Sequence, residues 1–131
     1  MGITLDINCQ ACGWNQGFRL GTGSGMARLR DALDLAPEEH RIRISEITTH
    51  YPDLAEDFEL CLLRCPSCGR LFERLRVSLL FNGNQRWEAE HCCDGCGSPL
   101  ESVADPDDVQ YLPCPGCGKQ ALVVAEARFW D

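Results

Sequence analysis

Four copies of one short cysteine motif, CxxCG, recur along the 131-residue chain and limit its possible folds more than any other feature. They occupy residues 9–13, 65–69, 93–97 and 114–118. A CxxC pair in a tight turn can present two thiolates to one metal ion, and the glycine that follows supplies the positive φ that closes such a turn. Four motifs of this kind predict structural metal binding at two tetrahedral sites.

Cysteine is abundant in this chain, with ten residues in a length that buries only a thin core without cross-links. In a secreted chain this count would indicate a disulfide framework. Residues 1–6 lack the basic and apolar segments of a signal peptide, and no run of about 18 apolar residues could span a membrane. We therefore expect a cytoplasmic protein that binds zinc, since zinc favours a tetrahedron of soft thiolate ligands.

The chain is acidic, with a formal net charge of −8. Each zinc ion bound by four thiolates contributes a net charge of about −2, which brings the loaded protein to about −12. This charge opposes nonspecific binding to nucleic acid. A smaller basic region does exist, because nearly half of the eleven arginines flank one predicted hairpin: Arg64, Arg70, Arg74, Arg76 and Arg86.

The polar face of that hairpin is the best candidate for a nucleic-acid site. Arg74, Arg76 and Arg86 share this face, but Glu88 and Glu90 lie on it as well and would partly neutralise it. We therefore favour a solvated face of ion pairs, with a phosphate or acidic-partner site as the alternative.

Two helices are expected between the first and second motifs. Met26, Leu29, Leu33 and Ala36 recur at helical spacing after Ser24, a plausible N-cap. A second helix would begin near Pro37 and end before Pro52. Its buried face would carry Ile44, Ile47 and Tyr51, and Glu39 would reach Arg43 one turn later.

Strands are expected on either side of the motifs. Alternating apolar residues predict strands at 3–7, 58–62 and 75–81, with a short strand near 100–103, a turn at 104–108 and a final strand at 121–130. For the hairpin after residue 75, a three-residue loop at Asn82–Asn84 is preferred. That loop places Leu79 opposite Trp87, Val77 opposite Ala89 and Arg76 opposite Glu90.

The pairing of the four motifs stays open. A sequential pattern joins the first motif to the second and the third to the fourth; it lets strands 3–7 and 58–62 pair directly and needs no site built from both ends of the chain. A nested pattern joins the second to the third and the first to the fourth, and the preferred hairpin register favours it. An interleaved pattern is the third alternative.

The motifs and their adjoining strands resemble the zinc-ribbon and rubredoxin-like class, whose knuckles read CPxCG; Pro66 and Pro115 match that proline. The resemblance leaves out the helical segment from about residue 26 to 51. It implies an α+β fold of small antiparallel zinc-ribbon hairpins with a helical insert, and two zinc ions per chain. The ligands that it implies are Cys9, Cys12, Cys65, Cys68, Cys93, Cys96, Cys114 and Cys117.

The chain is expected to form one compact unit, residues 1–131. Residues 1–69 would make a first ribbon half with a helical insert at about 24–51, and residues 70–131 would make the hairpin and a second ribbon. No long linker separates the two parts.

The remaining motifs indicate no catalytic chemistry. Residues 21–25 are rich in glycine but lack the Lys-Ser/Thr of a phosphate-binding loop, and the three histidines begin no HxE or HExxH motif. Cys61 and Cys92 are expected to be small buried residues of the core.

We therefore predict a structural zinc protein, acting as a protein-interaction or adaptor module and not as an enzyme. A nucleic-acid-associated zinc-ribbon factor that uses the hairpin arginines is one alternative. A redox or metal-handling protein with a rubredoxin-like iron site is the other.

Overall fold

The protein is a mixed α+β structure built on a seven-stranded antiparallel sheet. The computed structural model describes residues 2–23 and 26–130, so Ser24, the predicted N-cap, lies outside the described residues. Along the sheet the order is β5-β4-β3-β2-β1-β7, and β6 pairs with β3 off this path. The strands are β1 Gly2–Cys9, β2 Asn15–Gly21, β3 Ala55–Arg64, β4 Leu71–Phe81, β5 Gln85–Glu88, β6 Glu101–Ser102 and β7 Leu122–Trp130.

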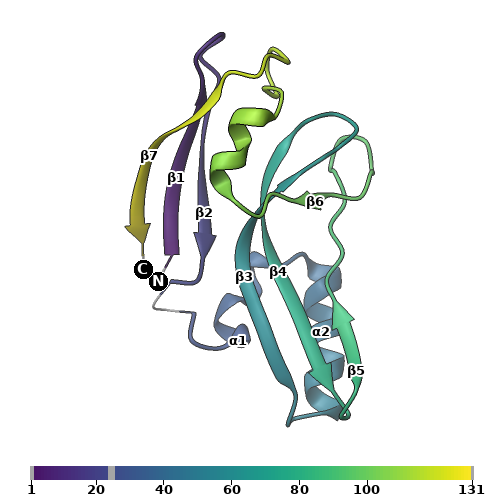
Figure 1. Cartoon of the computed structure of the whole chain (residues 1–131). Coiled ribbons are helices and arrows are strands. Elements are labelled where there is room, and N and C mark those ends of the chain that lie inside the picture. The colour runs from purple at the N-terminus through teal and green to yellow at the C-terminus, as the bar shows by residue number, and fades with distance from the viewer. Residues whose placement is uncertain (1, 24–25, 131) are drawn as a thin grey trace.

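The sheet is nearly divided in two between β2 and β3. These strands share one residue pair, Gly21 opposite Leu60, whereas β3 and β4 pair along ten residues each from Ala55–Leu80 to Arg64–Leu71. One part therefore consists of β1, β2 and β7, and the other of β3, β4 and β5 (Figure 1). The turns after β1 and after β3 both lie at the upper end of the molecule in that view, far from α2.

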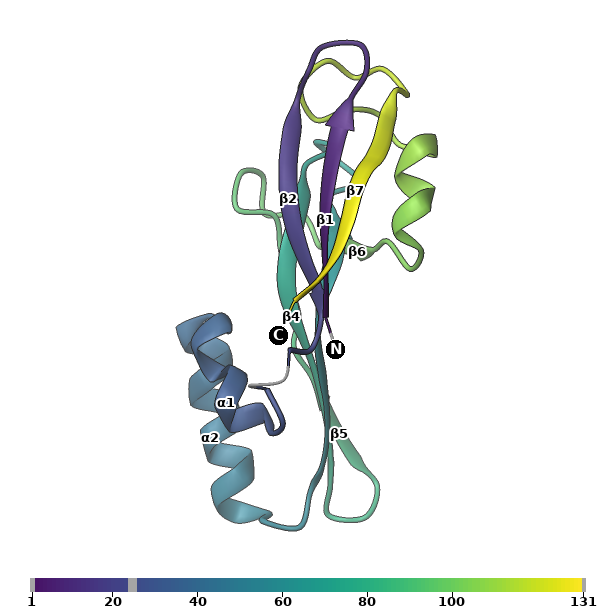
Figure 2. The same cartoon turned by 90° about the vertical axis from the view of Figure 1, so that its left-hand side faces the viewer.

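Helices cover both sides of this sheet (Figure 2). The first predicted helix is short, with α1 at Leu29–Ala32 continuing into a 3₁₀ turn, η1, at Leu33–Leu35. The second, α2, spans Glu38–His50, as predicted, and buries Ile44 and Ile47. Arg43 pairs with Glu46, at 3.0 Å, in place of the expected Glu39. A second 3₁₀ helix, η2 at Pro106–Tyr111, occupies the segment expected to be a turn and a short return.

Two apolar clusters form the core. The first lies between α1, α2 and the hairpin strands, and contains Leu29, Ile44, Leu75, Val77 and Leu79 among others. The second lies between the β1-β2-β7 part and the ends of β3 and β4 that adjoin the second cysteine motif. The second contains Leu5, Ile7, Phe18, Leu62, Leu71, Val109 and Leu122, and also the motif cysteines Cys9 and Cys114.

The predicted hairpin register is confirmed. Leu79 lies opposite Trp87 and Phe81 opposite Gln85, which leaves a three-residue loop, and the Ala89 N–H donates to the Val77 carbonyl at 3.0 Å. The apolar face of this hairpin follows the predicted alternation, since Leu75, Val77 and Leu79 are buried.

Two features of the sheet differ from expectation. Residues 15–21 form β2, a strand that the sequence did not indicate, and β2 pairs with β1 along its whole length. As a result β1 has β2 and β7 as its neighbours, and does not pair directly with β3. Among the described residues, no helix is long and apolar enough to cross a membrane.

Candidate metal centres

All four cysteine motifs adopt the same backbone turn. In each, the N–H of the first cysteine donates to the carbonyl of the residue five positions later, and the glycine N–H donates back to the first cysteine's carbonyl, at 2.8–2.9 Å throughout. The closing glycines, Gly13, Gly69, Gly97 and Gly118, have φ of +81°, +80°, +75° and +77°. A Cβ at any of them would meet no other atom, so the backbone angle and not lack of space requires glycine.

The structure gathers the eight predicted cysteines into two groups of four. One group is Cys9, Cys12, Cys114 and Cys117, and the other is Cys65, Cys68, Cys93 and Cys96; within each group the four sulfur atoms lie within 4.8 Å of one another. Each group could hold one metal ion. The motifs are therefore nested, and the sequential and interleaved alternatives are wrong.

The strand register explains the nesting. Cys9, at the end of β1, lies opposite Leu122, at the start of antiparallel β7, which brings the first motif beside the fourth. The second motif is the turn between β3 and β4. After β5 the chain continues back along β4, where His91 Nε2 lies 2.9 Å from the Leu75 carbonyl. This path brings the third motif beside the second.

The separations between sulfur atoms suit a tetrahedral ion. Cys9 Sγ lies 3.7 Å from Cys117 Sγ, and Cys12 Sγ lies 3.7 Å from Cys114 Sγ. In the second group, Cys65 to Cys96 is 3.4 Å and Cys68 to Cys93 is 3.6 Å. Four sulfur ligands at the usual zinc distance of 2.3 Å occupy corners about 3.8 Å apart, so both groups fit with small adjustments.

Each group has two buried and two exposed thiols. The first cysteine of every motif is buried, whereas the second is exposed: Cys12, Cys68, Cys96 and Cys117. Backbone N–H groups point at three of the buried sulfur atoms, from Ala11 to Cys9 at 3.4 Å, from Cys68 to Cys65 at 3.4 Å and from Gly116 to Cys114 at 3.2 Å.

The thiol pKa values diverge within each group. Burial raises the pKa of Cys9, but hydrogen bonds from the amides of Cys12 and Ala11 outweigh it and lower that pKa to about 7. In the second group, hydrogen bonds from the Ser98 side chain and amide lower the pKa of Cys96 to about 6. The Trp14 and Arg70 amides lower the pKa values of Cys12 and Cys68, but burial and crowding by neighbouring thiols raise them overall, to about 12 and 11.

Part of this divergence comes from the neighbouring thiols, which lower the pKa of Cys9 and Cys96 and raise that of Cys12 and Cys68, because four thiolates held together would repel one another. A divalent cation between them would remove that repulsion, because a metal ion deprotonates its coordinating thiols outright. The chemistry of both groups therefore fits a divalent metal with four sulfur ligands.

A large side chain from one motif covers a glycine of its partner motif in both groups. A Cβ at Gly116 would lie 3.4 Å from Trp14 Cδ1, and a Cβ at Gly95 would lie 2.7 Å from Arg70 Nη1. Trp14 and Arg70 both directly follow a motif's closing glycine, and Gly95 and Gly116 both precede a motif's second cysteine. The same contact between facing motifs recurs in both groups, and the sequence reasoning missed it.

Cys61 and Cys92 belong to neither group. Cys61, on β3, is half-buried with Sγ 3.8 Å from the Glu59 carbonyl, and burial raises the pKa of its thiol. Cys92 is exposed, so the prediction that it lies in the core is wrong. Its backbone pairs with Pro99 beside the third motif, which turns the chain there and leaves the thiol at the surface.

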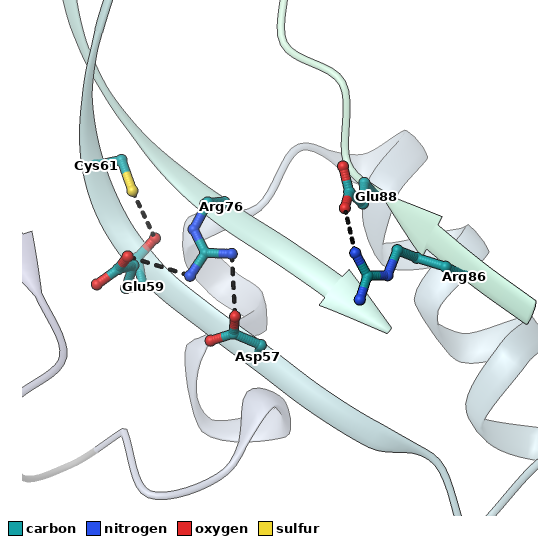
Figure 3. Close-up of polar contacts among 6 residues, drawn as sticks. All are labelled: Asp57, Glu59, Cys61, Arg76, Arg86 and Glu88. Carbon is teal, nitrogen blue, oxygen red and sulfur yellow. Dashed lines mark hydrogen bonds and ion pairs between the residues drawn. The ribbon is translucent and has the colours of Figure 1, made fainter. Parts of the chain in front are cut away.

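The arginines on the polar face of the hairpin, Arg74, Arg76 and Arg86, each have an acidic partner, and Figure 3 shows those of Arg76 and Arg86. Arg76 lies 3.2 Å from Asp57 and 3.1 Å from Glu59, and these hydrogen bonds raise the pKa of its guanidinium. Arg86 pairs with Glu88 at 3.4 Å, as the predicted polar face suggested. Arg74 pairs with Asp94 of the third motif at 2.8 Å.

The histidines make structural contacts and do not join the thiol groups. His40 is buried on α2 with Nε2 3.0 Å from the Glu90 carbonyl, and its ring meets that of His91 edge to face at 5.0 Å between centroids. His50 Nδ1 lies 2.9 Å from the Glu46 carbonyl near the end of α2.

Comparison with known proteins gives no match to a family model, to a curated protein or to a solved structure. What the two thiol groups can bind therefore follows from their own geometry and chemistry.

Proposed function

We propose that the protein binds two zinc ions, one in each four-cysteine group, and that these ions stabilise a zinc-ribbon type of fold. The observation that carries the proposal is the pair of four-sulfur groups with separations of 3.4–3.7 Å between neighbouring sulfur atoms. Zinc is favoured over iron because a rubredoxin-like electron carrier needs a single four-cysteine site, whereas this chain has two.

The role proposed for the metal is structural. A catalytic zinc keeps one coordination position open for water, whereas four cysteines in each group would fill a tetrahedron. A structural zinc ion contributes about 10 kcal/mol or more to folding, and the net stability of a typical domain is about 5–15 kcal/mol. Loss of either ion would therefore remove most of the stability of the surrounding strands.

Beyond metal binding, we propose a protein-interaction module without enzymatic activity. The main support is electrostatic, because the chain is acidic and Arg74, Arg76 and Arg86 are each paired with a carboxylate. Paired arginines attract phosphates weakly, since the partner carboxylate opposes the phosphate charge. The nucleic-acid alternative would have to separate these pairs.

Chelation of the purified protein tests the structural role. We expect a strong zinc chelator to lower sharply the melting temperature measured by circular dichroism, and added zinc to restore that temperature. The Cys61→Ser and Cys92→Ser variants are controls, because both cysteines lie outside the four-thiol groups and both variants should respond to chelator as the parent does. A melt that chelator leaves unchanged would contradict a structural metal.

A further inference from the structure

The strand β7 forms one edge of the sheet, beside β1 (Figure 1). Its first half packs on the second apolar cluster, where Leu122 is buried. From Ala125 to Phe129 every residue is exposed. A bulge divides the two halves, because Val124 lies opposite Ile7 and Glu126 opposite Asp6, which leaves Ala125 as an extra residue.

The backbone of this second half has groups that point away from the sheet. The Cys9 N–H donates to Trp14, on the β2 side, whereas the Gln10 N–H donates to Ala121, on the β7 side. Hydrogen bonds alternate along an antiparallel strand, so the even-numbered β1 residues face β7. Asp6 and Thr4 therefore bond to Glu126 and Arg128, and the N–H and C=O groups of Ala127 and Phe129 face outward.

Ala127 is flanked by opposite charges, Glu126 before it and Arg128 after it, so this segment is complementary in charge to an antiparallel copy of itself. In an antiparallel pair of identical strands centred on Ala127, each Glu126 lies opposite Arg128 of the other copy. The outward backbone groups of Ala127 would form the central hydrogen-bonded pair. The charged residues would then occupy the non-hydrogen-bonded positions, where opposing Cα atoms are about 4.5 Å apart and side chains are closest.

Neither charged side chain is firmly held within its own chain. Arg128 lies 3.7 Å from Asp6 and 3.8 Å from Glu126, and the side chains of Arg128 and Glu126 are 60% and 56% exposed. Phe129 is 75% exposed beside Ile3, which is 41% exposed, and in the same register Phe129 lies opposite the small Ala125 of the second copy. Pairing would cover part of this apolar surface.

We propose that this edge binds a second copy of the chain, through antiparallel pairing of residues 125–129 of β7. This proposal names a partner for the interaction role proposed above. It rests on the proposed function because the folded, metal-loaded chain is what presents the edge. The other edge strand, β5, is less suited, because it has four residues and short edges limit pairing.

Sedimentation equilibrium of the zinc-loaded full chain tests the proposal, at an ionic strength that screens repulsion between the acidic copies beyond about 8 Å. We expect a reversible monomer–dimer equilibrium. Glu126→Arg and Arg128→Glu each place like charges opposite one another twice, and each should raise the dissociation constant at least about tenfold. The double variant restores opposite charges and should dimerise like the parent.

Two further variants separate edge pairing from general effects. Ala127→Pro removes an outward N–H that β1 does not use, so it should abolish the dimer and retain the fold and zinc content. Arg86→Glu makes the same charge change on β5 and should leave the dimer intact. A chain that stays monomeric, or a dimer that survives Ala127→Pro, overturns the proposal. A monomer would mean that any strand pairing at this edge involves a different protein.

Zinc content and circular dichroism measured on the same samples distinguish the two levels of inference. A metal-loaded, folded monomer would overturn the second-copy pairing and leave the zinc proposal standing. A sample that is folded but contains no metal would instead count against the proposed zinc sites.

Discussion

Glycines in the cysteine motifs have two different roles. Gly13, Gly69, Gly97 and Gly118 supply a positive φ, which the sequence predicted from their place after each CxxC. Gly95 and Gly116 instead leave space for a neighbouring side chain. Only the third and fourth motifs carry glycine before the second cysteine, and only the first two are followed by Trp14 or Arg70. This asymmetry was present in the sequence and argues against sequential pairing.

The closing glycine of the second motif gives a prediction for a single residue. Gly69 has φ of +80°, so Gly69→Ala should destabilise the zinc-loaded protein by about 1–2 kcal/mol in chemical denaturation. Gly69→Asn is the matched control, because asparagine tolerates the left-handed region better and should have a smaller effect. Equal effects of the two substitutions would mean that the backbone angle is not the reason for glycine.

At the scale of the elements, the alternation of β4 predicted the hairpin and its register, because one face is buried and the other is not. β2 was missed for a physical reason. Its sequence, NQGFRLG, contains two glycines and a single fully buried residue, Phe18, so it lacks the alternation of a half-buried strand. Its pairing with β1 follows from the turn of the first motif, which reverses the chain.

Two adjacent leucines on β4 test the faces of this hairpin. Leu79 is 0% exposed in the first apolar cluster, whereas Leu80 is 39% exposed. We expect Leu79→Ala to lower the free energy of unfolding by about 2–5 kcal/mol. Leu80→Ala should lower it by less than about 1 kcal/mol, since little apolar area is lost from the core. Similar losses for the two variants would contradict the assigned faces.

Nested pairing predicts which cysteines share an ion. The Cys9→Ser/Cys117→Ser double variant alters one group and should retain one zinc ion per chain. Cys9→Ser/Cys65→Ser replaces the same number of cysteines, but one in each group, and should therefore lose both ions. Sequential pairing would reverse the two results, and zinc content measured after removal of loosely bound metal separates them.

For the whole molecule, the sequence predicted which cysteines come together better than how the chain is arranged around them. The eight cysteines that it selected are the eight that the structure brings together. The division of the chain into two ribbon halves stays a prediction, as does the absence of enzymatic activity. The hairpin register favoured the nested arrangement but could not settle it, because nesting also depends on β1 meeting β7. That contact joins residues more than one hundred positions apart, and the alternation within either strand does not specify it.

Elemental analysis of the purified, folded chain, together with a count of free thiols after denaturation, tests the central claim most directly. We expect two zinc ions per chain and all ten cysteines reduced once the metal is removed. Iron in place of zinc, fewer than two ions per folded chain, or cysteines of the two groups joined as disulfides would contradict the two-zinc fold.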